Sequence, residues 1–167
     1  MSEAVATAVE GFMLRGAEEK DVPLILSLIK ELAAYESLLD QVEATEETLM
    51  DSLFQRKVAE AVIGEYHGTP VGYILFFYNF STFTGKPGIY LEDLYVKPEL
   101  RRKGMGKAML SYLAKLSIDR DCSRFEWACL DWNTPSIGFY KSLGAVPMDQ
   151  WTVYRLTGKE REKLAEQ

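Results

Sequence analysis

Residues 89–118 read IYLEDLYVKPELRRKGMGKAMLSYLAKLSI, and this stretch decides the fold. Its β-prone start ends at Lys97-Pro98, which predicts a strand from Ile89 to Val96. A basic turn with two glycines follows, and after it the apolar spacing predicts an amphipathic helix from about Gly104 to Ile118. A strand, a glycine-containing turn and a helix in succession make the turn the most informative place in the chain for a binding site.

The sequence on either side predicts a mixed α/β fold with this strand–turn–helix at its centre. A glycine turn at His67-Gly68 separates two β-rich runs and indicates a hairpin. The expected order is β-α-α-β-β-β-α-β-α-β, without internal repeats or linkers. We expect a flexible leader over residues 1–10 and a single domain over residues 11–167. Two helices are expected early in the chain, one from Asp21 and one after Thr45, with these two residues as their N-caps. The other expected elements are a strand at 12–15, hairpin strands at 58–66 and 71–80, a strand at 125–130, a helix from Pro135 to Gly144, a strand at 151–156 and a charged tail at 159–167.

Composition excludes several classes of function. Of the 167 residues 47% are hydrophobic and 26% charged, which is typical of one soluble globular domain. The net charge of −6 disfavours nucleic acid as a partner and favours cationic small molecules. Two cysteines and one histidine supply neither a disulfide framework nor a zinc site, so we expect a cytoplasmic protein without a metal. The chain start lacks the pattern of a signal peptide, and the most apolar run is too short to span a membrane.

The turn Arg101-Arg102-Lys103-Gly104-Met105-Gly106 has the chemistry of a phosphate-binding site. The N-terminus of a helix presents unpaired N–H groups and a partial positive charge. Glycines at 104 and 106 let the backbone approach a diphosphate without an intervening Cβ. The hexapeptide matches neither the P-loop nor the dinucleotide fingerprint. Taken by itself, it fits equally well a solvated basic turn at the start of an ordinary helix.

Four ordered motifs carry a resemblance to a known family. RRKGMG fits the R/Q-x-x-G-x-G/A signature of the GNAT superfamily of N-acetyltransferases, at the strand–helix junction where that family places it. The chain resembles in particular the polyamine and thialysine branch, over nearly all of residues 12–156. The motifs are IKELAAYE (29–36), IYLEDLYV (89–96), RRKGMG (101–106) and LDWNTPSIGFYKSLGA (130–145).

The resemblance implies a mostly antiparallel central sheet flanked by helices, acetyl-CoA as co-substrate, and roles for individual residues. The backbone of Leu94, Tyr95 and Val96 would pair with the pantetheine arm, and Tyr140 matches the proposed general acid. The residues implied to bind the coenzyme are Leu94, Tyr95, Val96, Arg101, Arg102, Lys103, Gly104, Met105, Gly106, Lys107, Asn133, Thr134, Pro135 and Ser136. The residues implied to hold the amine are Tyr35, Glu36, Glu92 and Asp149.

The chemistry of acetyl transfer agrees with these residue types. A primary amine, with a pKa of about 10.4, must lose a proton before it attacks a thioester, and Glu92 can accept that proton directly or through a water. A tyrosine, with a pKa of about 10, remains protonated to meet the departing thiolate. Because side chains alternate along a strand, only one of Glu92 and Asp93 should face the cleft, and we choose Glu92. Tyr35 and Glu36 fit equally well the end of the first helix.

The loop before Ile89 bears on the identity of the acceptor. Polyamine acetyltransferases carry an acid and a tryptophan there, whereas this loop, NFSTFTG at residues 79–85, has Phe83 and no acid. Phe83 can stack on an ammonium or a methylene chain. We expect a polyamine, diamine or lysine-analogue amine as acceptor. The alternatives are a protein or peptide amine and a catalytically silent acyl-CoA-binding module. Resemblance to the branch also implies a homodimer formed through the C-terminal strand.

Overall fold

The computed structural model describes residues 3–167, which fall into two compact units. The first unit ends at Ala128 and contains the sheet, three helices and the central strand–turn–helix. The second unit, Cys129–Gln167, contains two helices joined by an extended segment. In the described residues, no helix is long and apolar enough to cross a membrane.

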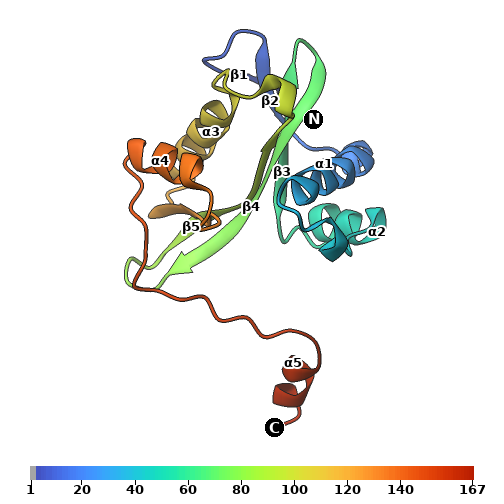
Figure 1. Cartoon of the computed structure of the whole chain (residues 1–167), viewed down its shortest axis with the longest axis vertical. Coiled ribbons are helices and arrows are strands. Elements are labelled where there is room, and N and C mark those ends of the chain that lie inside the picture. The colour runs from blue at the N-terminus through green and yellow to red at the C-terminus, as the bar shows by residue number, and fades with distance from the viewer. Residues whose placement is uncertain (1–2) are drawn as a thin grey trace. The chain divides into compact units, whose positions relative to one another are not determined.

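Six strands form one sheet in the order β1-β2-β3-β4-β5-β6 (Figure 1). Neighbouring strands are antiparallel except β5 and β6, which are parallel, so the expected mixed, mostly antiparallel sheet is confirmed. Val5 and Ala6, which lie in the segment expected to be a leader, pair with β2. The strands are β1 (Val5–Ala6), β2 (Phe12–Gly16), β3 (Glu60–Tyr66), β4 (Thr69–Ser81), β5 (Lys86–Val96) and β6 (Arg124–Trp127).

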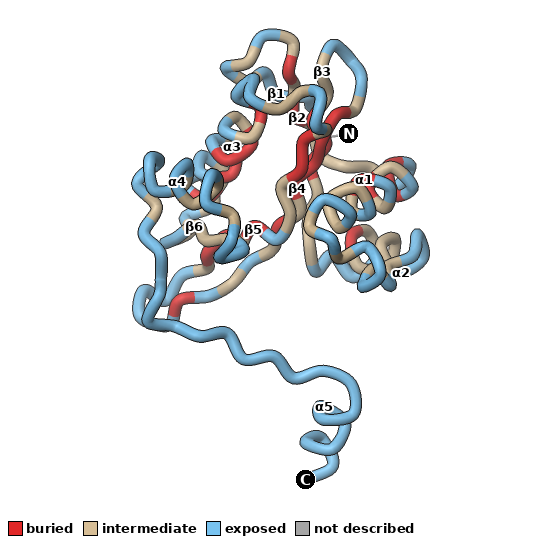
Figure 2. The backbone as a smooth tube through the Cα atoms, viewed as in Figure 1, coloured by how far each residue is buried: buried red, intermediate tan, exposed pale blue. Residues whose placement is uncertain are grey.

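Helices cover both faces of the sheet (Figure 1). Helix α1 (Val22–Tyr35) and helix α2 (Glu46–Met50), which continues into a π-helical turn at Asp51–Gln55, lie on one face. Helix α3 (Met105–Asp119) lies on the other. Burial is deepest along the middle of the sheet and the helix surfaces that face it (Figure 2). The core under α1 and α2 consists of Ile25, Leu28, Leu53, Ile63, Tyr73 and Tyr95.

The hairpin between β3 and β4 turns where the sequence predicts it. His67 has φ 49° and Gly68 has φ 81°, and positive φ at both central residues is the geometry of a type I′ turn. This turn twists in the same sense as the flanking strands. His67 is therefore a turn residue in the structure, as the sequence predicts.

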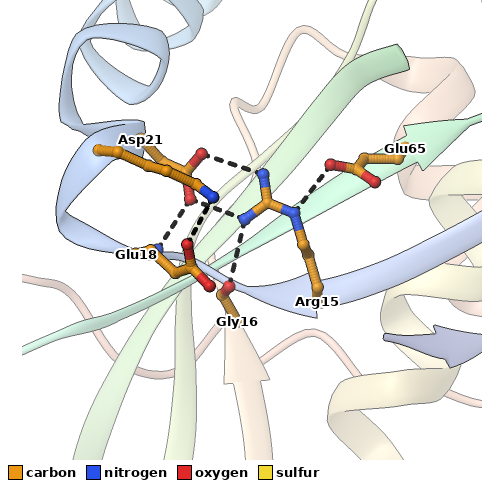
Figure 3. Close-up of polar contacts among 6 residues, drawn as sticks. Arg15, Gly16, Glu18, Asp21 and Glu65 are labelled. Carbon is orange, nitrogen blue, oxygen red and sulfur yellow. Dashed lines mark hydrogen bonds and ion pairs between the residues drawn. The ribbon is translucent and has the colours of Figure 1, made fainter. Parts of the chain in front are cut away.

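The two predicted N-caps have different outcomes. Thr45 caps α2, since its hydroxyl accepts a hydrogen bond from the Thr48 backbone N–H at 3.1 Å. Asp21 does stand at the N-cap position of α1, but its side chain makes no capping bond to that helix. The carboxylate instead accepts from the Arg15 guanidinium at 2.7 and 3.0 Å and from the Glu18 N–H at 2.8 Å (Figure 3). The Asp21 carboxylate therefore binds the Arg15 cation in preference to the N–H groups at the start of α1.

The second unit confirms one prediction and corrects another. Helix α4 (Thr134–Ser142) begins after Asn133 and is followed by Gly144 at φ 90°, as expected of a glycine beyond a helix end. The strand predicted at 151–156 is wrong, because this segment is an extended coil with exposed side chains. A β-prone run becomes a strand only when a neighbouring strand satisfies its backbone groups. The tail expected after it forms helix α5 (Gly158–Ala165).

Candidate active site

A β-bulge interrupts β5 at the pair of acids. Leu75 of β4 pairs with Asp93, whereas the next residue, Phe76, pairs with Leu91, so Glu92 is an extra residue in β5. A bulge places two residues opposite one and suspends the strict alternation of side chains. The premise that only one acid of the pair faces the site therefore does not apply here. Bulges are frequent next to active sites, where they re-aim side chains.

Asp93 lies against a buried tyrosine on the α1 side of the sheet. The Tyr73 hydroxyl donates a hydrogen bond to Asp93 Oδ2 at 2.6 Å, and Tyr73 itself is fully buried. Burial raises the pKa of the Asp93 carboxyl, and the bond from Tyr73 only partly offsets that rise. Burial and the neighbouring carboxylate raise the pKa of Tyr73 as well. Tyr73 therefore stays protonated and acts as a donor to Asp93.

Two further carboxylates share this environment. Glu36, at the C-terminal end of α1, has a pKa raised by burial and then by the charge of Asp93. Tyr73 also experiences the charges of Glu36 and Glu92. Asp93 thus contacts the phenol, and the charges of Glu36 and of the exposed Glu92 also act on it, so this region attracts a cation and can accept a proton from it. Sequence reasoning missed Asp93 and Tyr73, because the alternation rule set Asp93 aside and nothing in the sequence predicts a bulge.

The basic turn has the geometry that a diphosphate requires. Gly104 lies at φ 84°, a backbone conformation that side-chain-bearing residues rarely adopt, and α3 begins directly after it. A Cβ built on Gly106 would meet nothing nearer than the Leu94 side chain at 3.8 Å, so this backbone is open to a ligand. Arg102, Lys103 and Lys107 are exposed around it, and Met105 is buried beneath. These residues fit the diphosphate of a coenzyme.

Arg101 differs from its basic neighbours because its side chain turns toward α1. Its Nε donates to the Val96 carbonyl at 3.1 Å. Its guanidinium carbon lies 4.5 Å from the centre of the Tyr35 ring and 5.6 Å from that of Tyr95. The structure thus places Tyr35, an expected acceptor-site residue, in contact with the first residue of the turn.

The remaining expected residues lie on α4 and in loops. Asn133 accepts from the Ser136 N–H at 3.4 Å as the N-cap of α4. Tyr140 lies within the same helix, and burial, followed by the nearby Cys129, raises the pKa of its hydroxyl. The hydroxyl is therefore protonated at neutral pH, as a general acid must be. Phe83 and Asp149 are exposed, Phe83 in the loop between β4 and β5 and Asp149 in the coil after α4.

A bulged strand leading into a glycine turn and a helix N-terminus is the frame of an acyl-coenzyme A transferase, and comparison with known proteins agrees. The family model described as the acetyltransferase (GNAT) family matches residues 27–145. The chain belongs to this family. It is an N-acetyltransferase that acts on amines, and the family implies acetyl-CoA as its co-substrate.

Curated relatives match along most of their length. A thialysine N-epsilon-acetyltransferase from Sus scrofa is 41% identical over 165 residues, covering 92% of this chain and 96% of that protein. An L-ornithine N5-acetyltransferase from Arabidopsis thaliana is 30% identical over 191 residues, covering 87% of this chain and 84% of the relative. The branch that the motifs indicate is thereby confirmed.

Solved structures share the fold at low sequence identity. An integron cassette protein from V. cholerae superposes with a TM-score of 0.79 at 23% identity, covering 94% of this chain and 99% of its own. An aminoglycoside acetyltransferase from an uncultured soil metagenomic sample reaches a TM-score of 0.75 at 19% identity, covering 89% and 97% of the two chains. At this identity the likeness establishes the fold.

Proposed function

We propose that this N-acetyltransferase acetylates the terminal amine of a small diamine or a lysine-analogue side chain, such as thialysine or ornithine. The observation that carries the proposal is the Asp93 carboxylate bonded to the Tyr73 hydroxyl, with Glu36 and Glu92 near enough for their charges to act on the same phenol. Carboxylates grouped in this way, with Asp93 and Glu36 partly buried and Glu92 exposed, attract an alkylammonium and can take up its proton. The names of the curated relatives support the same class of acceptor.

In this proposal Glu92 accepts a proton from the bound ammonium, directly or through a water, while Asp93 and Glu36 hold the cation. The free amine attacks the thioester carbonyl in a ternary complex, with no covalent enzyme intermediate. A backbone N–H near Leu94, close to the bulge, donates to the oxyanion. As the intermediate collapses, the C–S bond breaks and Tyr140 protonates the departing thiolate, while the nitrogen loses its second proton to solvent and solvent restores the Tyr140 proton. This assignment of Tyr140 rests on its position in the motif at 130–145 and on its protonated state.

The coenzyme side is proposed on the residues of the turn. The N–H groups at the start of α3, with Arg102, Lys103 and Lys107, hold the diphosphate, and the resemblance at residues 130–145 implies Asn133–Ser136 as further coenzyme-binding residues. The two units form one acetyltransferase domain in this proposal, and the family match across residues 27–145, which includes the unit boundary, supports it. The free thiols Cys122 and Cys129 support a reducing, cytoplasmic location.

An acetyl-CoA turnover screen tests the proposed acceptor. The wild type is assayed on lysine analogues, ornithine, polyamines and amine-bearing peptides, with Tyr140→Phe in parallel. We expect turnover on a small amine and a fall of kcat by about 10²- to 10⁴-fold in Tyr140→Phe, the usual contribution of one general acid. Turnover confined to peptides would favour a protein acceptor. No turnover on any amine, with coenzyme still bound, would contradict an enzymatic role.

The diphosphate assignment has a test of its own. Gly106→Val places a branched side chain over an open helix start without meeting a close neighbour, so the fold should persist while acetyl-CoA affinity falls at least about 10-fold. Gly138→Val in α4, where a Cβ would also meet nothing, is the matched control and should bind normally. Calorimetry with acetyl-CoA measures both. Equal affinity for acetyl-CoA in the two folded variants would contradict the assignment of the diphosphate to this turn.

We also propose a homodimer formed through residues 151–156. Trp151, Val153 and Tyr154 are apolar, β-prone and 78%, 87% and 93% exposed, and an extended apolar run of this kind is suited to pairing with a second copy. Light scattering at micromolar concentration should give a dimer mass, and Val153→Pro, which removes a backbone donor, should give a monomer. A wild-type monomer at these concentrations would contradict the proposal.

A further inference from the structure

Arg101 joins the coenzyme side of the site to the acceptor side. Its Nε is fixed on the Val96 carbonyl, at the end of the strand expected to receive the pantetheine arm. Its guanidinium carbon lies 4.5 Å from the Tyr35 ring centre, in the last turn of α1, and 5.6 Å from that of Tyr95. The flat cation therefore lies against two aromatic rings, one from the strand and one from the helix, which is a favourable cation–π arrangement.

A second set of contacts joins the same two elements one helical turn earlier. Lys97 forms an ion pair with Glu31 at 3.4 Å. Burial and then the same Glu31 carboxylate raise the pKa of the Tyr95 hydroxyl to about 12, so Tyr95 also lies near Glu31. Glu31 and Tyr35 stand four residues apart on α1, so they face the same side of the helix. The end of α1 thus contacts the segment 95–101 in two successive helical turns, through Glu31 and through Tyr35.

The residue after Tyr35 is Glu36, which belongs to the acceptor side of the proposed site. Glu36 ends the helix, and its N–H donates to the Leu32 carbonyl at 3.0 Å. The chain reverses at Ser37, which has φ 59°. These last bonds lie at a helix end with Tyr35 half exposed, where stability comes from few contacts. Because Glu36 directly follows Tyr35, a contact that fixes Tyr35 also restrains the backbone that carries the Glu36 carboxylate.

We propose that Arg101 is a positioning residue that transmits coenzyme binding to the acceptor side, holding Tyr35 and with it Glu36, rather than a ligand of the diphosphate. This rests on the proposed function and adds a coupling to it. Binding of the coenzyme along β5 and the turn immobilises Val96 and Arg101. Because Arg101 lies on Tyr35, the end of α1 becomes ordered and the acceptor binds more tightly. The reverse effect, of acceptor on coenzyme, must have the same size.

The first experiment needs no catalysis. Hydrogen exchange is measured at the amides of Glu36, Ser37 and Leu38 with and without coenzyme A. In the wild type, coenzyme A should slow exchange there. In Arg101→Gln, exchange without coenzyme should be about 3- to 30-fold faster, the range expected from losing a cation–π contact, and coenzyme A should no longer slow it.

A matched variant isolates the contact with α1. Lys103 is a cation on the same turn whose Nζ lies 5.6 Å from a different ring, that of Tyr66. Lys103→Gln should therefore leave exchange at the end of α1 unchanged. In the double variants, Arg101→Gln should add almost nothing to Tyr35→Leu, which lacks the ring, but should act fully on Tyr35→Phe, which keeps it.

The second experiment separates positioning from diphosphate binding by changing the donor. Acetylpantetheine lacks the diphosphate, so a diphosphate ligand cannot affect its reaction. We expect Arg101→Gln to raise the acceptor KM with both acetyl-CoA and acetylpantetheine, and Lys103→Gln to impair only acetyl-CoA. Arg101→Lys, which keeps a cation without the planar fork, should recover part of the loss.

The outcomes divide clearly. Unchanged hydrogen exchange at the end of α1 in Arg101→Gln, or a rise in acceptor KM seen with acetyl-CoA alone, overturns the positioning role. Either result would favour Arg101 as a ligand of the diphosphate. A wild type that turns over no amine overturns the proposed function. In that case slower exchange with coenzyme A that depends on Arg101 still supports the coupling, and its absence contradicts it.

Discussion

Asp21 and Asp93 are two inward-facing carboxylates of the same unit with opposite surroundings. Asp21, 5% exposed, accepts two hydrogen bonds from Arg15 and one from the Glu18 backbone (Figure 3). These partners, Arg15 first, lower its pKa despite the opposing effect of burial. Asp93 lies beside the Tyr73 phenol and other carboxylates, and burial raises its pKa. In residues 3–167, no lysine or arginine forms an ion pair with Asp93.

This difference in charged partners distinguishes a carboxylate that stabilises the fold, Asp21, from one that is suited to bind a cationic ligand, Asp93. The charge of Asp21 is compensated within the fold, so nothing is left for a ligand to supply. Holding a negative charge on Asp93, close to other carboxylates and partly removed from water, costs free energy, and a bound ammonium would lower that cost. Pairs of titratable groups whose surroundings move their pKa values in opposite directions often mark this division of roles. The comparison can be tested on catalysis, stability and pH dependence.

The largest effect is expected on catalysis. Glu92→Gln keeps the size of the side chain but cannot accept a proton, so kcat/KM for the best acceptor should fall by about 10²- to 10⁴-fold. The loss should be greatest at lower pH, where an amine of pKa about 10.4 is scarcely deprotonated and the base contributes most. Steady-state rates between pH 6 and 9 measure it.

The same assay compares the two aspartates. Asp93→Asn should raise the acceptor KM, because it removes charge from the proposed acceptor site, whereas Asp21→Asn should leave KM unchanged in the folded protein. A wild-type rate in Glu92→Gln would place the base elsewhere, with Asp93 as the next candidate. A KM change in Asp21→Asn equal to that in Asp93→Asn would remove the distinction between the two sites.

The next effect is on stability at neutral pH. Asp21→Asn keeps an acceptor for the Glu18 N–H but leaves Arg15 with Glu65 as its charged partner, at 2.8 Å. Loss of hydrogen bonds between charged groups in a nearly buried place should lower the free energy of unfolding by about 2 kcal/mol. Urea denaturation measures it. The control is Lys20→Gln, which removes an exposed cation of the same cluster and should leave the midpoint nearly unchanged.

Elements with a strong local signal could be predicted from the sequence. The turn at His67-Gly68, the Thr45 cap and the glycine turn before α3 all follow from local chemistry and are found where expected. The strand expected at 151–156 is a coil, because pairing depends on a neighbour that the segment itself does not specify.

The site shows the same limit. RRKGMG locates the turn that we propose for the diphosphate, since the glycines and the positive charge are visible in the sequence. The bulge at Glu92 is a matter of register between β4 and β5, and no local pattern reveals which strand carries the extra residue. For that reason the choice between Glu92 and Asp93 could not be made by alternation. The contact of Arg101 with Tyr35 joins residues 66 positions apart and depends on the tertiary fold.

The smallest effect, and the sharpest test of the comparison, is the pH dependence of stability. A carboxyl whose pKa is raised by folding binds more protons in the native state, so its ionisation destabilises the fold as pH rises from the unfolded pKa, about 3.9, through the raised value. Asp93→Asn removes this penalty while its amide oxygen can still accept from Tyr73. The variant should therefore be more stable than the wild type by about 1 kcal/mol at pH 7, and the difference should vanish below about pH 4. Asp21→Asn should show the opposite sign, because the pKa of Asp21 is lowered: the wild type exceeds it at pH 7 and loses that advantage as acid protonates Asp21. Urea midpoints of the three proteins between pH 3 and 7 measure both differences. Differences of the same sign for the two variants would contradict the distinction between Asp21, which is paired with a cation, and Asp93, which is not paired with one within the described residues.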